Sequence, residues 1–352
     1  MSFSSDLLKW YDKNHRKLPW RETKNPYYIW LSEIILQQTR VEQGLPYYYK
    51  FTEAFKDVFI LANAKEEQVL KLWQGLGYYS RGRNLHATAK VISKDFNGKF
   101  PQTFNEIKKL KGIGDYTAAA IASFAFNKPH AVVDGNVYRV LSRLFLIDTP
   151  INSTEGKKLF AKIADDILDK KYPAKFNQAI MELGALVCKP ANPECANCPV
   201  HTYCKAYEKK AQNSVPVKLK KLKIKNRFLN YFVFKDGKYI YIKQRTAKDI
   251  WQGLFDFPVV DADHILETAS EQKKEALKLS GSKKVTIEKI SKPFKHQLTH
   301  QNIQAVFVEV WCKPSAAIVK KNNWIKIEPR NIHQYALPKL MEKYLEETEK
   351  QE

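Results

Sequence analysis

The sequence predicts two domains, an N-terminal all-α domain with a glycine turn and a cysteine loop, and a C-terminal α+β domain. Helical periodicity dominates the first 204 residues, and four cysteines crowd into residues 188–204. After residue 228, short strand patterns alternate with helices. A chain of 352 residues is long enough for both domains. We therefore expect a helical domain at 1–204, a basic linker at 205–227 and an α+β domain at 228–352.

The composition indicates a polyanionic partner. Lys and Arg total 59 against 37 for Asp and Glu, which gives a net charge of +22 and a pI near 9.5. Such a charge suits nucleic acid, although a lysine-rich solvated surface would give the same count. The sequence has neither an apolar run long enough for a membrane span nor the order of a secretion signal at its N-terminus. We expect a cytoplasmic protein with no membrane partner.

The first helix is expected over residues 6–20, and Pro26 begins the second. Glu33 lies beside the apolar stripe of that second helix, with Gln37 one turn later. A carboxyl at the edge of apolar surface has a raised pKa, as a general acid near neutral pH requires, whereas a solvated Glu would have no such role. The uncharged side chains of Gln37, Gln38 and Thr39 offer donors and acceptors to a groove. The stripe consists of Tyr27, Trp30, Leu31, Ile34 and Ile35.

Residues 76–84 interrupt the helical pattern with glycines, aromatics and arginines. Aromatic rings interleaved with cations suit base stacking and phosphate contact, although a tyrosine pair is also ordinary packing.

Residues 110–140 hold two candidate features. Gly112-Ile113-Gly114 forms a tight turn whose N–H groups can approach a phosphate, unless it is an ordinary turn between helices. Asp134 precedes a helix with one apolar face and occupies its N-cap position, which is by itself a structural role.

Four cysteines carry the most specific signal. Cys188, Cys195, Cys198 and Cys204 follow a C-x6-C-x2-C-x5-C spacing, which fits a cubane iron-sulfur cluster or zinc. Disulfides are a poor alternative without a secretion signal.

The C-terminal part shows a β-hairpin, with strands at 231–234 and 239–242 around Asp236-Gly237. A helix near 265–279, strands near 284–289 and 303–311, and a helix from about 337 complete the expected unit. Residues 294–300 are expected to form a polar loop.

Together these motifs resemble the helix-hairpin-helix DNA glycosylases with an iron-sulfur loop, and within them the MutY-type adenine glycosylases. Residues 18–21, 32–39 and 75–79 are the most specific parts of the match. The C-terminal part is similar to the family's Nudix-like domain. No Glu-rich Nudix hydrolase signature follows Gly253, so pyrophosphatase activity is not expected.

The resemblance implies an all-α helix-hairpin-helix glycosylase fold with a [4Fe-4S] cluster on the four cysteines, followed by an α+β Nudix-like domain. It implies a monomer that removes undamaged adenine from double-stranded DNA containing 8-oxoguanine·A or G·A mispairs.

The same resemblance assigns four catalytic residues. Glu33 protonates the adenine, Asp134 faces the positive charge that grows on the sugar, Asn136 holds Asp134, and Tyr116 matches the active-site tyrosine. We expect Glu33 to have a raised pKa and Asp134 a low one. Relatives that cut the strand carry a Lys where this chain has Tyr116, and a phenol forms no Schiff base. Base removal without strand cleavage is expected.

The resemblance also assigns contacts to the flipped adenine and the duplex. Gln38 and Tyr78 would wedge into the duplex, and Gln178 stands where some relatives have Glu. Thr299 replaces the usual Ser of a lesion-reading loop that ends at His300. The remaining candidates are Arg21, Gln37, Thr39, Leu76, Lys111, Gly112 and Gly114.

Two rivals remain. A thymine glycosylase for G·T mismatches can pair Tyr with the same Asp, and a catalytically silent DNA-binding relative would use only the fold and cluster. Glu33 and the C-terminal domain argue against the first rival, and the presence of both Glu33 and Asp134 argues against the second.

Overall fold

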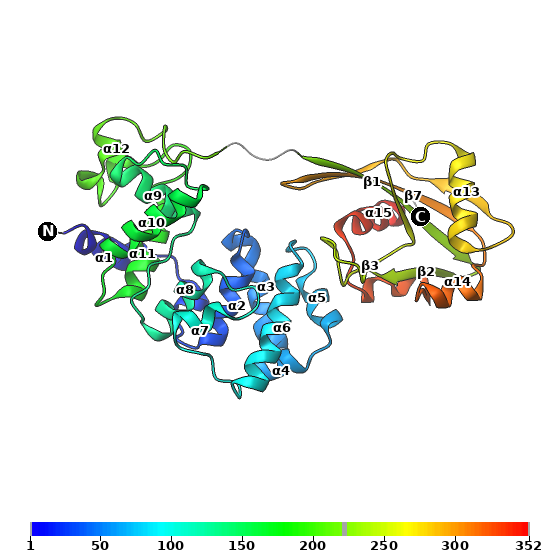
Figure 1. The fold of residues 1–352 in the computed structure, drawn as a ribbon, viewed down its shortest axis with the longest axis horizontal. Coiled ribbons are helices and arrows are strands. Elements are labelled where there is room, and N and C mark those ends of the chain that lie inside the picture. The colour runs from blue at the N-terminus through cyan, green and yellow to red at the C-terminus, as the bar shows by residue number, and fades with distance from the viewer. Residues whose placement is uncertain (1, 220–223, 351–352) are drawn as a thin grey trace. The chain divides into compact units, whose positions relative to one another are not determined.

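The computed structural model describes residues 2–219 and 224–350, which form two compact units (Figure 1). The first unit comprises the described parts of 1–63 and 84–220, and the second comprises 64–83 with the described parts of 221–352. A helical first unit and a second unit built on a sheet confirm the predicted fold class. Residues 64–83 group with the second unit, and most of the expected linker groups with the first. The boundaries 1–204, 205–227 and 228–352 stay a prediction.

The described residues of the first unit form helices joined by turns and loops, without strands. Its elements are α1 (Phe3–Asn14), η1 (Pro19–Arg21), α2 (Pro26–Leu36), α3 (Val41–Ala54), α4 (Val58–Asn63), most of α6 (Ser80–Asp95), α7 (Phe104–Lys108), α8 (Asp115–Phe126), α9 (Gly135–Phe145), α10 (Thr154–Ile167), α11 (Pro173–Leu186), η2 (Cys195–Asn197), η3 (His201–Tyr203) and α12 (Lys205–Glu208).

The first helix ends earlier than predicted. α1 stops at Asn14, and a 3-10 turn begins at Pro19. Proline restricts the residue before it to extended backbone, and Leu18 indeed has φ −127° and ψ 131°. The polypeptide therefore turns at residues 15–18, and both Arg16 and Arg21 contact Glu182 of α11.

The packing of α1, α9, α10 and α11 fixes the start of α9. Their apolar faces share one core that contains Leu7, Leu141, Phe160, Phe176 and Leu183, all nearly inaccessible to solvent. α2 packs on α8, and α8 on α11. These contacts hold α2, the N-terminus of α8, the N-terminus of α9 and α11 around one space.

The second unit is built on an eight-stranded mixed sheet. The main strand order is β3-β2-β1-β7-β5; β4 pairs with β1, β6 with β7 and β8 with β2. β1 and β7 run parallel from Lys225 opposite Gln301 to Lys235 opposite Trp311, and the other pairs are antiparallel. The elements are α5 (Glu66–Trp73), β1 (Lys225–Asp236), β2 (Tyr239–Gln244), β3 (Phe255–Asp256), β4 (Val259–Ala262), α13 (Ala269–Ser280), β5 (Thr286–Ile290), β6 (Phe294–Gln297), β7 (Gln301–Trp311), α14 (Ala316–Lys321), β8 (Ile325–Ile327), η4 (Pro329–Gln334) and α15 (Lys339–Glu349).

The expected polar loop at 294–300 is partly wrong, because residues 294–297 form β6. Phe294 lies opposite Ala305 of β7, and Gln297 lies opposite Asn302. Its side chains alternate between half-buried and exposed positions, as in a strand with one solvated face. Within the described residues, no helix is both long and apolar enough to cross a membrane.

Candidate active site

Glu33 is a buried carboxyl on α2, only 6% exposed. Asn25 caps this helix by accepting the N–H of Tyr27, and Pro26 starts it with a fixed φ. Burial raises the pKa of Glu33 to about 7, although a hydrogen bond with Tyr116 opposes the shift. A carboxyl with this pKa can hold a proton near neutral pH and give it to a bound group.

Asp134 caps α9, where its Oδ1 accepts the N–H of Val137 at 2.7 Å. Its Oδ2 accepts from Nδ2 of Asn136 at 2.9 Å. The expectation of a low pKa for Asp134 was wrong, because burial raises its pKa and outweighs these hydrogen bonds. Arg139 donates to Oδ1 of Asn136 at 2.8 Å and to the carbonyl of Cys188 at 2.7 Å, so Asn136 is itself held.

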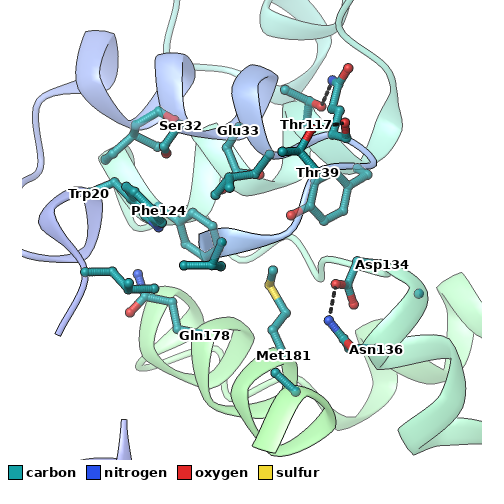
Figure 2. Close-up of a pocket in the computed structure, with 18 of the residues that line it drawn as sticks. Trp20, Ser32, Glu33, Thr39, Thr117, Phe124, Asp134, Asn136, Gln178 and Met181 are labelled. Carbon is teal, nitrogen blue, oxygen red and sulfur yellow. Dashed lines mark hydrogen bonds between the residues drawn. The ribbon is translucent and has the colours of Figure 1, made fainter. Parts of the chain in front are cut away.

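Both carboxyls line one cavity of about 670 Å³ in the first unit. Figure 2 shows Glu33 reaching into it from α2, Asp134 from the start of α9, and Gln178 and Met181 from α11. A cavity of this size can hold a purine base and its sugar. Ten of the residues predicted from sequence line it: Arg21, Glu33, Gln37, Gln38, Thr39, Gly114, Tyr116, Asp134, Asn136 and Gln178.

The edge of this cavity is formed where α2 ends. Gln37 donates from Nε2 to Oγ1 of Thr117 at 3.1 Å, and Gln38 has a left-handed φ of +55°. A left-handed residue outside glycine is uncommon and marks a local constraint. The turn places Gln37, Gln38 and Thr39 along the edge of the cavity.

Sequence reasoning missed a buried ionic cluster in the cavity wall. Glu182 on α11 accepts from Arg16 and Arg21, and Tyr11 donates to Oε1 of Gln178 at 2.8 Å. Burial would raise the pKa of Glu182, but the hydrogen bonds from the two arginines outweigh it and lower the pKa to about 2. No local signal marks Glu182, because it lies 166 residues from Arg16 and 161 residues from Arg21 in the chain.

The glycine turn joins α7 to α8. Gly112 has φ +80°, and Gly114 is the N-cap of α8. Lys111, Gly112 and Gly114 are exposed, and the carbonyl of Lys111 accepts from Thr88 at 2.8 Å. The turn therefore presents backbone N–H groups and a cation to solvent, as phosphate contact requires.

The other predicted contacts lie in the second unit. Leu76, Tyr78 and His300 line a separate cavity of about 510 Å³ there, together with Trp251. Tyr78 is 45% exposed and has a left-handed φ of +49°. Thr299 is not among the residues that line this cavity.

The four cysteines line a small cavity beside α9 and α12. Arg143 on α9 is buried and donates hydrogen bonds to the sulfur of Cys188 at 3.3 Å and to the carbonyls of Lys189 and Pro190. These bonds attach the start of the cysteine-containing loop to α9. A four-thiol donor set fits an iron-sulfur cluster or zinc.

The family model described as "HhH-GPD superfamily base excision DNA repair protein" matches residues 31–165. A NUDIX domain model matches residues 230–347. The first match, together with a helical hairpin fold that places two carboxyls in one base-sized cavity, defines the class of enzyme: the chain is a DNA N-glycosylase.

Similarity to known proteins identifies the family within this class of enzyme. The adenine DNA glycosylase of Buchnera aphidicola subsp. Baizongia pistaciae is 39% identical over 85% of this chain and 83% of its own length. That of Buchnera aphidicola subsp. Schizaphis graminum is 35% identical over 98% of both chains. The structure of a thermostable thymine-DNA glycosylase is 30% identical with a TM-score of 0.55, and the match covers 59% of this chain and 95% of that one. The chain belongs to the adenine DNA glycosylase family.

Proposed function

We propose that this chain excises undamaged adenine from 8-oxoguanine·A and G·A mispairs in double-stranded DNA, acting as a monomer and without cutting the strand. The observation that carries the proposal is that Glu33 and Asp134 line one base-sized cavity. A flipped nucleotide would place its base and its sugar within reach of both carboxyls.

Glu33 would act as the general acid. Its pKa of about 7 keeps a proton available near neutral pH, and Tyr116 hydrogen-bonds to it. Protonation of the adenine ring turns a poor leaving group into a good one. The C1′–N9 bond then breaks, and its electron pair leaves with the base.

Asp134 would stabilise the positive charge left on the sugar, or trap it covalently, until water adds at C1′. Its pKa is raised in the free protein, but a cation forming beside it favours the ionised carboxylate. Asn136 and the N–H of Val137 hold its two oxygens in fixed positions. Such preorganisation avoids reorientation during the reaction.

The second unit would read the base opposite the adenine. Its cavity combines the aromatic rings of Tyr78 and Trp251 with His300, which suits an oxidised purine. Thr299 does not line this cavity, but it precedes His300 and carries a hydroxyl. We expect Thr299→Ala to reduce the preference for 8-oxoguanine·A over G·A more than it reduces activity on G·A.

The four cysteines would hold a [4Fe-4S] cluster, whose role is to order the basic loop. The four thiols line one small cavity, and their C-x6-C-x2-C-x5-C spacing suits a cubane cluster. We expect about four irons per chain in the purified protein, and zinc in their place would contradict the assignment.

Two findings support adenine over thymine. The adenine relatives match 85% and 98% of this chain, whereas the thymine-DNA glycosylase structure matches 59%. Base release from 8-oxoguanine·A, G·A and G·T duplexes under single-turnover conditions tests the choice. We expect adenine release from the first two duplexes, fastest with 8-oxoguanine.

Two variants test the residues. Glu33→Gln and Asp134→Asn should each slow adenine release at least about 100-fold while duplex binding persists. Unchanged release in either variant, or thymine release as the main activity, would sink the proposal. Borohydride trapping should give little protein–DNA adduct, because Tyr116 cannot form the Schiff base.

A further inference from the structure

A buried ionic cluster shares the cavity with Glu33. Glu182 on α11 is 0% exposed and accepts four hydrogen bonds. Three come from Arg16, through its backbone N–H at 2.8 Å, Nε at 2.9 Å and Nη2 at 2.8 Å, and the fourth comes from Nη2 of Arg21 at 2.7 Å. All three residues line the same cavity as Glu33.

Glu182 determines where the charge of Arg21 lies. Nη1 of Arg21 donates to the carbonyl of Arg16 at 3.1 Å, and the guanidinium lies 5.9 Å from the ring centre of Tyr11. These contacts fix a cation that is only 12% exposed in its side chain. A buried cation acts over a longer range than a solvated one, so a compensating carboxylate matters here.

We propose that Glu182 is a positioning residue for base excision: it holds Arg21 and Arg16 against α11 and compensates their charge, so that Glu33 keeps its proton when a base occupies the cavity. The inference rests on the proposed role of Glu33 as the acid. Glu182 has no covalent or proton-transfer role in it.

The sign of the effect follows from the charges around Glu33. The positive charge of Arg21 favours ionised Glu33, and the negative charge of Asp134 favours the protonated form. Removing the charge of Glu182 leaves Arg21 uncompensated, so Glu33 should lose its proton at lower pH. The titratable and charged groups that face the cavity are Arg16, Arg21, Asp115, Tyr116, Asp134 and Glu182, and Glu42 on α3 lies near Arg16.

The test is the pH dependence of single-turnover adenine release by the full chain, measured from pH 5.5 to 9. Activity should fall as pH rises through the value at which Glu33 loses its proton. In Glu182→Gln this fall should move about one pH unit lower, and release at pH 8.5 should drop about tenfold. In Arg21→Gln the fall should move to higher pH.

Two further variants separate charge from packing. Glu182→Asp keeps the charge, so its activity should decline at the same pH as that of the wild type, even if the rate of adenine release differs. Glu182→Gln combined with Arg21→Gln should return the fall toward that of the wild type. If Glu182→Gln alone does not fold, the double variant is compared with Arg21→Gln: the fall in activity should lie at lower pH in the double variant, and a coincident pH dependence would overturn the positioning role.

The outcomes distinguish this inference from the proposed function. A coincident pH dependence in the wild type, Glu182→Gln and Arg21→Gln would overturn the positioning role, although loss of activity in Glu33→Gln would still support the proposed function. Full activity in Glu33→Gln would overturn both.

Discussion

Glu33 carries a cost in stability because it is buried with a raised pKa. A carboxyl with an ordinary pKa near 4.5 in the unfolded chain and about 7 in the folded protein binds its proton more tightly when folded. Its contribution to stability is therefore fully present below pH 4.5 and is lost as pH rises through 7. The active-site acid should be a source of instability in alkaline solution.

Replacing Glu33 with Gln should remove this dependence, since an amide has no proton to lose. The quantity to compare is the change in the free energy of unfolding that Glu33→Gln causes at each pH. This change should be more stabilising at pH 8.5 than at pH 5 by on the order of 2–3 kcal/mol. Urea denaturation at the two pH values measures the difference. Glu53→Gln, at an exposed position on α3, is the matched control and should show no such difference. Equal effects of Glu33→Gln at both pH values would contradict the prediction.

The residues that sequence alone could identify have local signatures. Glu33 stands beside a stripe with helical spacing, and Asp134 immediately precedes an apolar helix. Glu182 has no such signature, because its role depends on Arg16 and Arg21 arriving from another part of the chain. The raised pKa of Asp134 was missed for a similar reason, since burial is a property of the fold rather than of the neighbouring sequence.

The α7–α8 hairpin depends on one glycine more than on the other. Gly112 has φ +80°, and a Cβ added there would lie 2.7 Å from Cβ of Asn84. Gly114 has φ −96°, and a Cβ there would meet nothing within 4 Å. The first position needs glycine for both backbone and space, whereas the second tolerates a side chain.

This difference gives a matched pair of variants. Gly112→Ala should lower the free energy of unfolding by about 2–3 kcal/mol, through backbone strain and contact with Asn84. Gly114→Ala should cost less than about 1 kcal/mol, because neither effect applies. Thermal and urea unfolding would measure both values. Equal losses in the two variants would show that the turn is not constrained as described.

Helices and strands were predicted best where local sequence, such as the turn of a hairpin, determines their structure. The hairpin of β1 and β2 was confirmed: Gly237 and Lys238 form its turn, between the paired residues Asp236 and Tyr239. β6 was taken for a loop because Lys295, His296 and Gln297 are polar, yet pairing with β7 makes it a strand. Strand pairing is a long-range property, so polar residues alone do not exclude it.

At the scale of the whole molecule, the net charge of +22 implies binding that depends on salt. Each cation that neutralises a phosphate releases counterions. The logarithm of the binding constant therefore falls linearly with the logarithm of the salt concentration. Lys111 in the glycine turn is exposed beside the N–H groups of Gly112 and Gly114. A phosphate held there would be contacted whatever the sequence or damage of the duplex.

Lys111→Ala should therefore weaken binding to matched and mispaired duplexes by the same factor, and it should reduce the slope of log Kd against log salt by about 1. Fluorescence anisotropy from 50 to about 300 mM salt would measure both quantities. Lys278→Ala, on α13 of the second unit, removes a lysine that is 76% exposed and pairs with Glu275, so it has the same net charge change. If Lys278→Ala lowered the slope equally, the dependence would reflect total charge rather than phosphate contact at the turn. An effect of Lys111→Ala confined to mispaired DNA would instead assign this lysine to the recognition of the mispair.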